Sequence, residues 1–264
     1  MPDFERDGWR LAYDDQGTGP AVLFIHGLLM DRTMFDAQAE ALANRYRVVL
    51  PDLRGHGESE HGGEPYDQWD LMEDDVALLD HLGIERAVWG GVSQGGFQSL
   101  RASLKHPDRV AGLVLIDTQA GPEDETRAPM YEASAQVAVE SGWNEDLLGI
   151  AASILIGASA SDAVRQHWIA RWLAQDTSDA LQVIQSVTRR DDITDRLPEI
   201  QAPAIVIHGT EDVAIDMDRA RELADGLAGP TEFVTVDAGH SSTVEQQDAV
   251  TAAIEGFLER VWPA

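Results

Sequence analysis

The stretch GVSQGG, residues 91–96, decides the fold. It contains the pattern G-x-S-x-G, which is short enough to occur by chance, so its meaning depends on the segments around it. Residues 87–92 are apolar enough for a buried strand, and residues 94–106 have the spacing of a helix. A serine on the turn between a strand and a helix is the arrangement of a nucleophile elbow. We therefore predict that Ser93 is a nucleophile, and that the three glycines around it let the strand and helix backbones come close.

The chain on either side of this stretch alternates between strand and helix patterns. Strands are predicted at 9–15, 21–26, 47–52, 87–92, 111–118, 203–209 and 232–239. Helices are predicted at 33–44, 66–82, 94–106, 217–227 and 245–261. Such alternation is typical of βαβ units, so we predict an α/β fold whose mostly parallel sheet carries helices on both faces.

The alternation stops between residues 122 and 195. This segment has no convincing strand, and helical patterns cover 126–141, 145–157, 161–175 and 178–189. The simplest interpretation is a core domain made of residues 1–121 and 196–264, with a helical cap of residues 122–195 inserted into it. The cap would cover the site, and its tryptophans are candidates to line an apolar pocket, although such spacing is also typical of packing residues: Trp143, Trp168 and Trp172.

A nucleophilic serine needs a base that takes its proton and an acid that orients the base. His240 is the one histidine after residue 208, and it follows the last predicted strand, where active-site groups collect in α/β sheets. Asp212 lies shortly after strand 203–209, and Asp117 ends strand 111–118. Either aspartate could orient the histidine. We favour Asp212 because it gives the chain order serine, acid, histidine, and we keep Asp117 as the alternative acid.

Two backbone N–H groups should stabilise the oxyanion that forms when the serine attacks. One is expected on the residue after the nucleophile, Gln94, and the other on the loop after strand 21–26. That loop reads HGLLMD, residues 26–31, and Leu28 is the candidate donor. His26 in the same loop is expected to make structural hydrogen bonds rather than to act as a second base.

Composition excludes several classes of function. The chain of 264 residues has 47 acidic and 19 basic residues, a net charge of −28. A field of this sign repels phosphate backbones and anionic lipids, so we expect a small-molecule substrate, with neither nucleic acid nor membrane as a partner. The absence of cysteine excludes cysteine-ligated metals. His81 and His106 have acidic neighbours, but both lie near predicted helix ends where histidine suits the helix dipole, and we expect no metal and no cofactor.

The N-terminal segment MPDFERDGWR lacks the apolar stretch of a signal peptide. No apolar run approaches the roughly 18 residues needed to cross a bilayer. From these two observations we expect a cytoplasmic protein.

Five motifs in order make the chain resemble the α/β-hydrolase superfamily: HGLL at 26–29, DLRGHGES at 52–59, GVSQGG at 91–96, HGTED at 208–212 and GH at 239–240. The resemblance implies an eight-stranded, mostly parallel sheet with a helical cap inserted after the sixth strand. It also implies that DLRGHGES is a structural loop near the site and that His56 within it is structural. The chain is most similar to the small, capped, cofactor-free members, which include carboxylesterases, 3-oxoadipate enol-lactonases, haloperoxidase/perhydrolase-like enzymes and meta-cleavage C–C hydrolases.

These residues predict a serine hydrolase that cleaves an ester or lactone of a small, largely apolar substrate through an acyl-enzyme. C–C bond hydrolysis or perhydrolysis on the same triad is an alternative. A different class of function, a ligand receptor that retains the hydrolase fold, is a further alternative.

Overall fold

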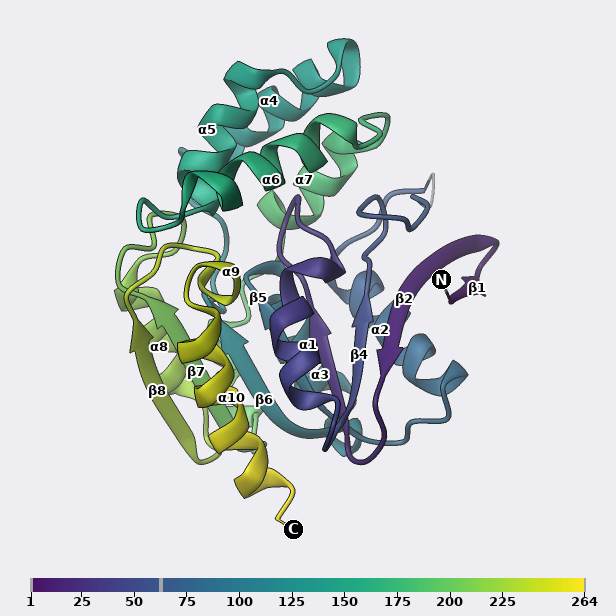
Figure 1. Cartoon of the computed structure of the whole chain (residues 1–264), viewed down its shortest axis with the longest axis vertical. Coiled ribbons are helices and arrows are strands. Elements are labelled where there is room, and N and C mark those ends of the chain that lie inside the picture. The colour runs from purple at the N-terminus through teal and green to yellow at the C-terminus, as the bar shows by residue number, and fades with distance from the viewer. Residues whose placement is uncertain (1, 62–63, 264) are drawn as a thin grey trace.

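The computed structural model describes residues 2–61 and 64–263, and one sheet runs through it (Figure 1). Within these ranges eight strands lie in the order β1-β2-β4-β3-β5-β6-β7-β8. Their bounds are β1 Asp3–Arg6, β2 Trp9–Gln16, β3 Ala21–Ile25, β4 Arg47–Pro51, β5 Ala87–Val92, β6 Val110–Ile116, β7 Ala204–Gly209 and β8 Thr231–Val236. β2 is antiparallel to both β1 and β4, and every other neighbouring pair is parallel. The predicted α/β fold with its mostly parallel, eight-stranded sheet is confirmed.

Helices cover both faces of the sheet. Two helices, α1 (Asp36–Leu42) and α10 (Gln247–Val261), pack against the strand side chains on one face of the sheet. Three helices pack against those on the other face: α2 (Gln68–His81), α3 (Gln94–Lys105) and α8 (Met217–Gly226). Every residue of β3, β5, β6 and β7 is buried. Strands buried on both faces are continuous apolar runs rather than alternating ones, which is why these four are easy to find in the sequence.

Four further helices lie between β6 and β7, above the end of the sheet at which the parallel strands finish (Figure 1). They are α4 (Ala128–Ser141), α5 (Glu145–Leu155), α6 (Asp162–Ala174) and α7 (Ala180–Thr188). We call these four helices and their connections the cap. Each overlaps one of the helical segments predicted for residues 122–195, whereas the division of the chain into a core domain and a cap domain stays a prediction. No helix in the described ranges combines the length and the apolar character needed to span a membrane.

The remaining elements are short and differ from the sequence prediction in detail. The edge strand β1 was not predicted, because it has four residues and Phe4 is its one buried side chain. Short helical turns occur at Arg32–Phe35, Pro107–Arg109 and Thr194–Glu199. The last predicted helix, 245–261, corresponds to α10; a short helix that was not predicted, α9 (Ser242–Glu245), precedes it and is separated from it by Gln246, which has a φ of −130°.

Candidate active site

Ser93 occupies the turn between β5 and α3. Its φ of 50° and ψ of −107° lie outside the regions that non-glycine residues normally adopt. Its N–H donates to the carbonyl of Ile116 at 2.9 Å, and its carbonyl accepts the N–H of Phe97 at 3.1 Å and the hydroxyl of Thr118 at 2.8 Å. Such a conformation costs about 1–3 kcal/mol and persists only where surrounding contacts impose it. These bonds from β6, α3 and the segment after β6 hold the serine at the top of the turn.

The glycines around Ser93 are required by close approach of the backbone. A Cβ atom on Gly91 would overlap the backbone of Gly95, and one on Gly95 would overlap the carbonyl of Ile25 in β3. A Cβ atom on Gly96 would overlap the side chain of Thr118. The first turn of α3 therefore lies directly against β3 and β5, as the pattern of glycines predicts.

His240 and Asp212 form a buried pair at the end of the sheet. The Nδ1 atom of His240 lies 2.8 Å from Oδ2 of Asp212. The other carboxylate oxygen of Asp212 accepts the N–H groups of Ala214 at 2.8 Å and Ile215 at 3.0 Å. Burial opposes the charged form of the imidazole, but the charge and hydrogen bond of Asp212 outweigh it and raise the pKa of His240. Burial likewise opposes the carboxylate, and His240 outweighs it and lowers the pKa of Asp212.

Asp117, the alternative acid, has different partners. One of its carboxylate oxygens accepts the N–H of Gly209 at 2.8 Å, and the other accepts the N–H of Ser242 at 3.0 Å. Within the described ranges no hydrogen bond joins it to His240. It instead connects the end of β6 with the end of β7 and with the loop that carries His240. Burial and the nearby charge of Asp212 raise the pKa of Asp117 to about 7.

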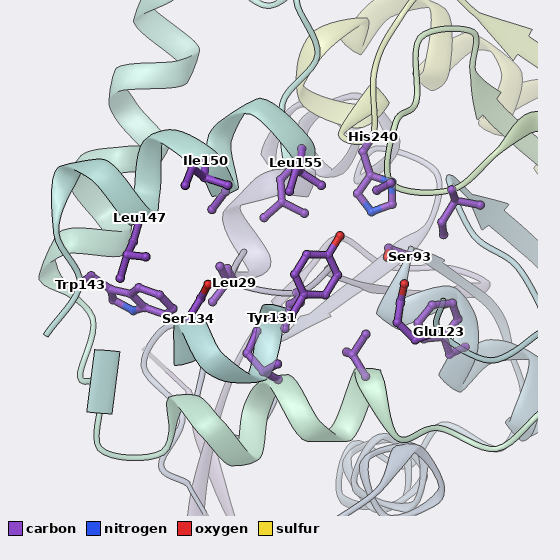
Figure 2. A pocket seen from close by; sticks show the side chains of 18 residues that line it. Leu29, Ser93, Glu123, Tyr131, Ser134, Trp143, Leu147, Ile150, Leu155 and His240 are labelled. Carbon is purple, nitrogen blue, oxygen red and sulfur yellow. The ribbon is translucent and has the colours of Figure 1, made fainter. Parts of the chain in front are cut away.

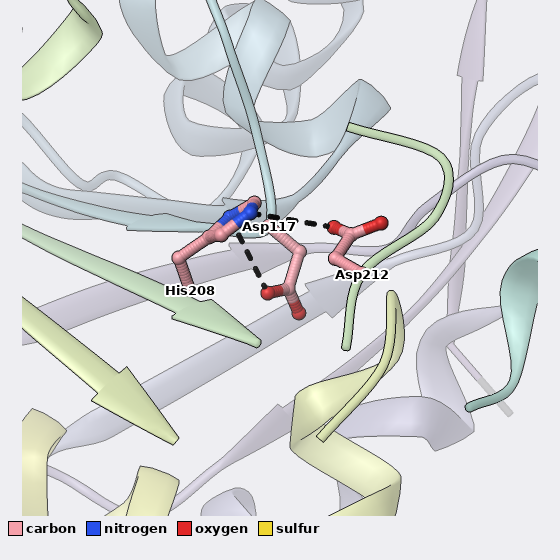
Figure 3. A group of neighbouring side chains, drawn as sticks. All are labelled: Asp117, His208 and Asp212. Carbon is pink, nitrogen blue, oxygen red and sulfur yellow. Dashed lines mark ion pairs between the residues drawn. The ribbon is translucent and has the colours of Figure 1, made fainter. Parts of the chain in front are cut away.

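His208 lies between these two aspartates (Figure 3). Its Nδ1 is 3.8 Å from Asp117 and its Nε2 is 3.9 Å from Asp212. Nε2 is also 3.1 Å from the carbonyl of Ile215, to which it can donate. Burial lowers the pKa of His208. The carboxylates of the cluster are hydrogen-bonded to backbone N–H groups or to His240, and Nδ1 of His208 is buried without a hydrogen-bond partner among the described residues.

The loop after β3 presents a free backbone donor. In the part of the chain that the structure describes, the N–H groups of Leu28 and Gln94 donate to no protein acceptor. Leu29, which has a φ of 62°, donates its N–H to Nε2 of His56 at 3.2 Å. The other ring nitrogen of His56 lies 3.0 Å from the carbonyl of Arg54, to which it can donate. The DLRGHGES segment therefore holds the loop in which the predicted oxyanion donor Leu28 lies.

His26 and His56 are both neutral at ordinary pH. Burial lowers the pKa of His26 to about 4 and that of His56 to about 3. A neutral imidazole can accept a hydrogen bond, and Nε2 of His26 accepts the N–H of Leu53 at 3.0 Å. Their contacts are those of structural residues that join the loop after β3 to the loop after β4.

Ser93 and His240 line one cavity beneath the cap (Figure 2). Figure 2 shows the two residues toward one end of this cavity, and Trp143 and Leu147 toward the other. Within the described ranges no hydrogen bond joins the Ser93 hydroxyl to His240. Catalytic hydrogen bonds are often long before substrate binds and shorten in the complex with substrate. Most of the lining is apolar and comes from the cap, for example Leu147, Ile150, Leu155 and Ile184.

The three tryptophans of the cap have different surroundings. Trp143 lines the cavity. Trp168 and Trp172 are not among its lining residues, and both are buried in the apolar cluster that includes Met34 and Leu148. For these two the packing interpretation describes their position, because they belong to the same buried cluster as side chains of α5 and of the turn Arg32–Phe35. Contact between Trp143 and a substrate stays a prediction.

Glu245 connects the cap with the loop that carries His240. One of its carboxylate oxygens accepts the N–H groups of Gly157 at 2.9 Å and Ser241 at 3.2 Å. The other accepts the N–H of Gly239 at 2.9 Å and the hydroxyl of Ser159 at 3.1 Å. The sequence gives no signal for this contact, because its partners in the cap lie more than 80 residues away along the chain.

Comparisons with known proteins find similar sequences and structures over nearly the whole chain. A sequence model of the family described as "alpha/beta hydrolase fold" matches residues 20–146. A non-heme haloperoxidase from Rhodococcus erythropolis is 28% identical, over 96% of this chain and 97% of that protein. The structure of a thermophilic esterase from Thermogutta terrifontis is 31% identical with a TM-score of 0.91, over 98% of this chain and 97% of that one. The structure of an enol-lactonase from Burkholderia xenovorans LB400 is 28% identical with a TM-score of 0.89, over 97% of this chain and 99% of that one. The chain therefore belongs to the α/β-hydrolase family of enzymes.

Proposed function

We propose that this protein is a serine hydrolase that cleaves a carboxylic ester or lactone of a small, largely apolar molecule through an acyl-enzyme. The observation that carries the proposal is the cavity that Ser93 and His240 share, with His240 held by Asp212 at 2.8 Å. The esterase and the enol-lactonase among the similar structures act on bonds of this class, which supports the same reaction type here.

The proposed reaction has two halves. In the first, the hydroxyl oxygen of Ser93 attacks the carbonyl carbon while Nε2 of His240 takes its proton. The N–H groups of Leu28 and Gln94 donate to the oxyanion, and His240 then protonates the departing alcohol oxygen. In the second half, water attacks the acyl-enzyme with His240 as base, and the acid product leaves as the Ser93 hydroxyl is restored.

Replacement of the nucleophile tests the proposal. Ser93→Ala should lower kcat on p-nitrophenyl butyrate by about 10⁴-fold or more, because the covalent route is lost. A fluorophosphonate probe should label the wild type at Ser93 and leave this variant unlabelled. The matched control is Ser153→Ala, which alters an exposed serine of α5 outside the cavity and should retain both activity and labelling. Full activity in a folded Ser93→Ala variant would refute the mechanism.

Perhydrolysis is a second candidate, because the chain is similar to a haloperoxidase over nearly its whole length. In that reaction hydrogen peroxide replaces water in the second half, and its oxygen takes the acyl group to give a peracid. Acetate ester and hydrogen peroxide should then yield peracetic acid in a Ser93-dependent manner. Rapid turnover in either assay would also exclude the alternative of a receptor that binds its ligand without turning it over.

A further inference from the structure

The cavity beneath the cap has a one-sided charge. Among the described residues that line it, Glu123 is the one carboxylate and no lysine or arginine is present. The other polar lining groups are hydroxyls and an imidazole: Ser93, Tyr131, Ser134 and His240. Figure 2 shows Glu123 at the end of the cavity where Ser93 lies, far from Trp143.

A buried arginine, Arg190, donates a hydrogen bond to the carboxylate of Glu123. Its Oε2 accepts a hydrogen bond from Arg190 at 2.9 Å, and its Oε1 accepts the N–H of Asp124 at 3.2 Å. The side chain of Arg190 is 1% exposed and that of Glu123 is 12% exposed. Arg190 also donates to the carbonyls of Gly121 and Val187, so the protein holds it away from the cavity. The negative end of the pair therefore faces the substrate space.

The carboxylate is within electrostatic reach of the reaction centre. Its charge is one of those that raise the pKa of His240, after the larger effects of burial, Asp212 and Asp117. The guanidinium of Arg190 lies 4.3 Å from the centroid of the Phe97 ring, and Arg190, unlike Phe97, is not among the described residues that line the cavity. A substrate anion bound there would thus lie close to Glu123, and no lysine or arginine of the cavity lining could pair with that anion.

We propose that Glu123 makes this site selective for uncharged esters and lactones, and that it excludes substrates with a carboxylate near the reacting carbonyl. The inference rests on the proposed hydrolase function and names its substrate class. Two like charges separated by a few ångströms in a poorly solvated pocket repel strongly enough to lower kcat/KM by about tenfold or more.

The test compares pairs of substrates that differ in one charge. Each pair consists of a p-nitrophenyl hydrogen dicarboxylate and its methyl ester, prepared from glutarate and from adipate, with spontaneous hydrolysis measured on Ser93→Ala and subtracted. Wild type should have at least about tenfold higher kcat/KM for the methyl ester of a pair. The preference should persist in 1 M NaCl, where the screening length is about 3 Å and the general repulsion from the net charge is removed.

Substitution then assigns the preference to one residue. Glu123→Gln should shift the ratio of the two rates toward the anionic ester by about tenfold. Because this variant leaves Arg190 buried without its partner, the double variant Glu123→Gln/Arg190→Gln should be measured beside it. The matched control is Glu125→Gln, which removes the same charge from an exposed position two residues away and should leave the ratio unchanged.

The outcomes separate the inference from the function on which it rests. If wild type hydrolyses neither methyl ester, the proposed function fails. If it hydrolyses the methyl esters and the anionic esters equally well, Glu123 does not select charge although the hydrolase function stands. An unchanged ratio in both Glu123 variants would overturn the inference in the same way.

Discussion

At the scale of single residues, two buried aspartates have separate tasks. Asp212 lies within hydrogen-bonding distance of His240, which we propose it orients, and Asp117 accepts two backbone N–H groups. Asp212→Asn should lower kcat by about 10⁴-fold, because an amide can stabilise neither the required tautomer nor the imidazolium. Asp117→Asn should mainly reduce the free energy of unfolding, by about 1–3 kcal/mol, because one N–H loses its acceptor. Ester kinetics and urea denaturation of both variants check this, and a loss of kcat confined to Asp117→Asn would reverse the assignment.

The pH dependence of the reaction also depends on one residue, His240. In the proposed mechanism the imidazole must be neutral to accept the serine proton, and Asp212 raises its pKa above the ordinary value of 6.5. The rate kcat/KM should therefore fall as pH falls, with its half-point above pH 6.5. In Asp212→Asn the remaining activity should have its half-point at lower pH, because burial then acts without the opposing charge. A half-point that does not move in this variant would contradict the coupling.

At the scale of elements, the loop that carries His240 depends on α9 and the cap. The two carboxylate oxygens of Glu245 accept hydrogen bonds from four donors. In Glu245→Gln one of these oxygens becomes an NH2 group that cannot accept, so we expect a lower melting temperature and a lower kcat. The loss of stability should be about 1–3 kcal/mol. Asp248→Asn is the matched control, because it removes one charge at an exposed position near the start of α10. A normal kcat in Glu245→Gln would show that the loop is held by other contacts.

The helices and strands are predicted well where the residues that carry the signal lie within one short stretch of the sequence. The four central strands are continuous apolar runs because they are buried on both faces, and the glycines of residues 91–96 report a close backbone approach. β1 carries no such signal. The choice between Asp117 and Asp212 could be argued only from chain order, because the bonds that distinguish them join residues 92 and 125 positions apart. Glu123 and Glu245 were not predicted for the same reason.

At the scale of the whole molecule, the net charge of −28 governs the response to salt. Repulsion among like charges destabilises the compact state, and salt screens it. The melting temperature should therefore rise as NaCl is increased from about 0.01 to 0.3 M, while the screening length falls from about 30 to 6 Å. Exposed ion pairs such as Arg45–Glu259 weaken under the same conditions, but each contributes little. A melting temperature that falls with salt would mean that ion pairs outweigh the repulsion.

The contact of Glu245 with the loop at residues 157–159 limits how this protein can be recombined with its relatives. Exchange of the helices between β6 and β7 for those of another hydrolase replaces the cap partners of Glu245, Gly157 and Ser159, but retains the carboxylate. Chimaeras that keep residues 157–159, or that change Glu245 together with the graft, should fold and turn over substrate better than chimaeras joined only at the two chain connections. Glu245 is one of several core residues whose cap partners a graft would replace; Asp31 binds Arg171, Gln68 binds Ser186 and Ser241 binds Leu155.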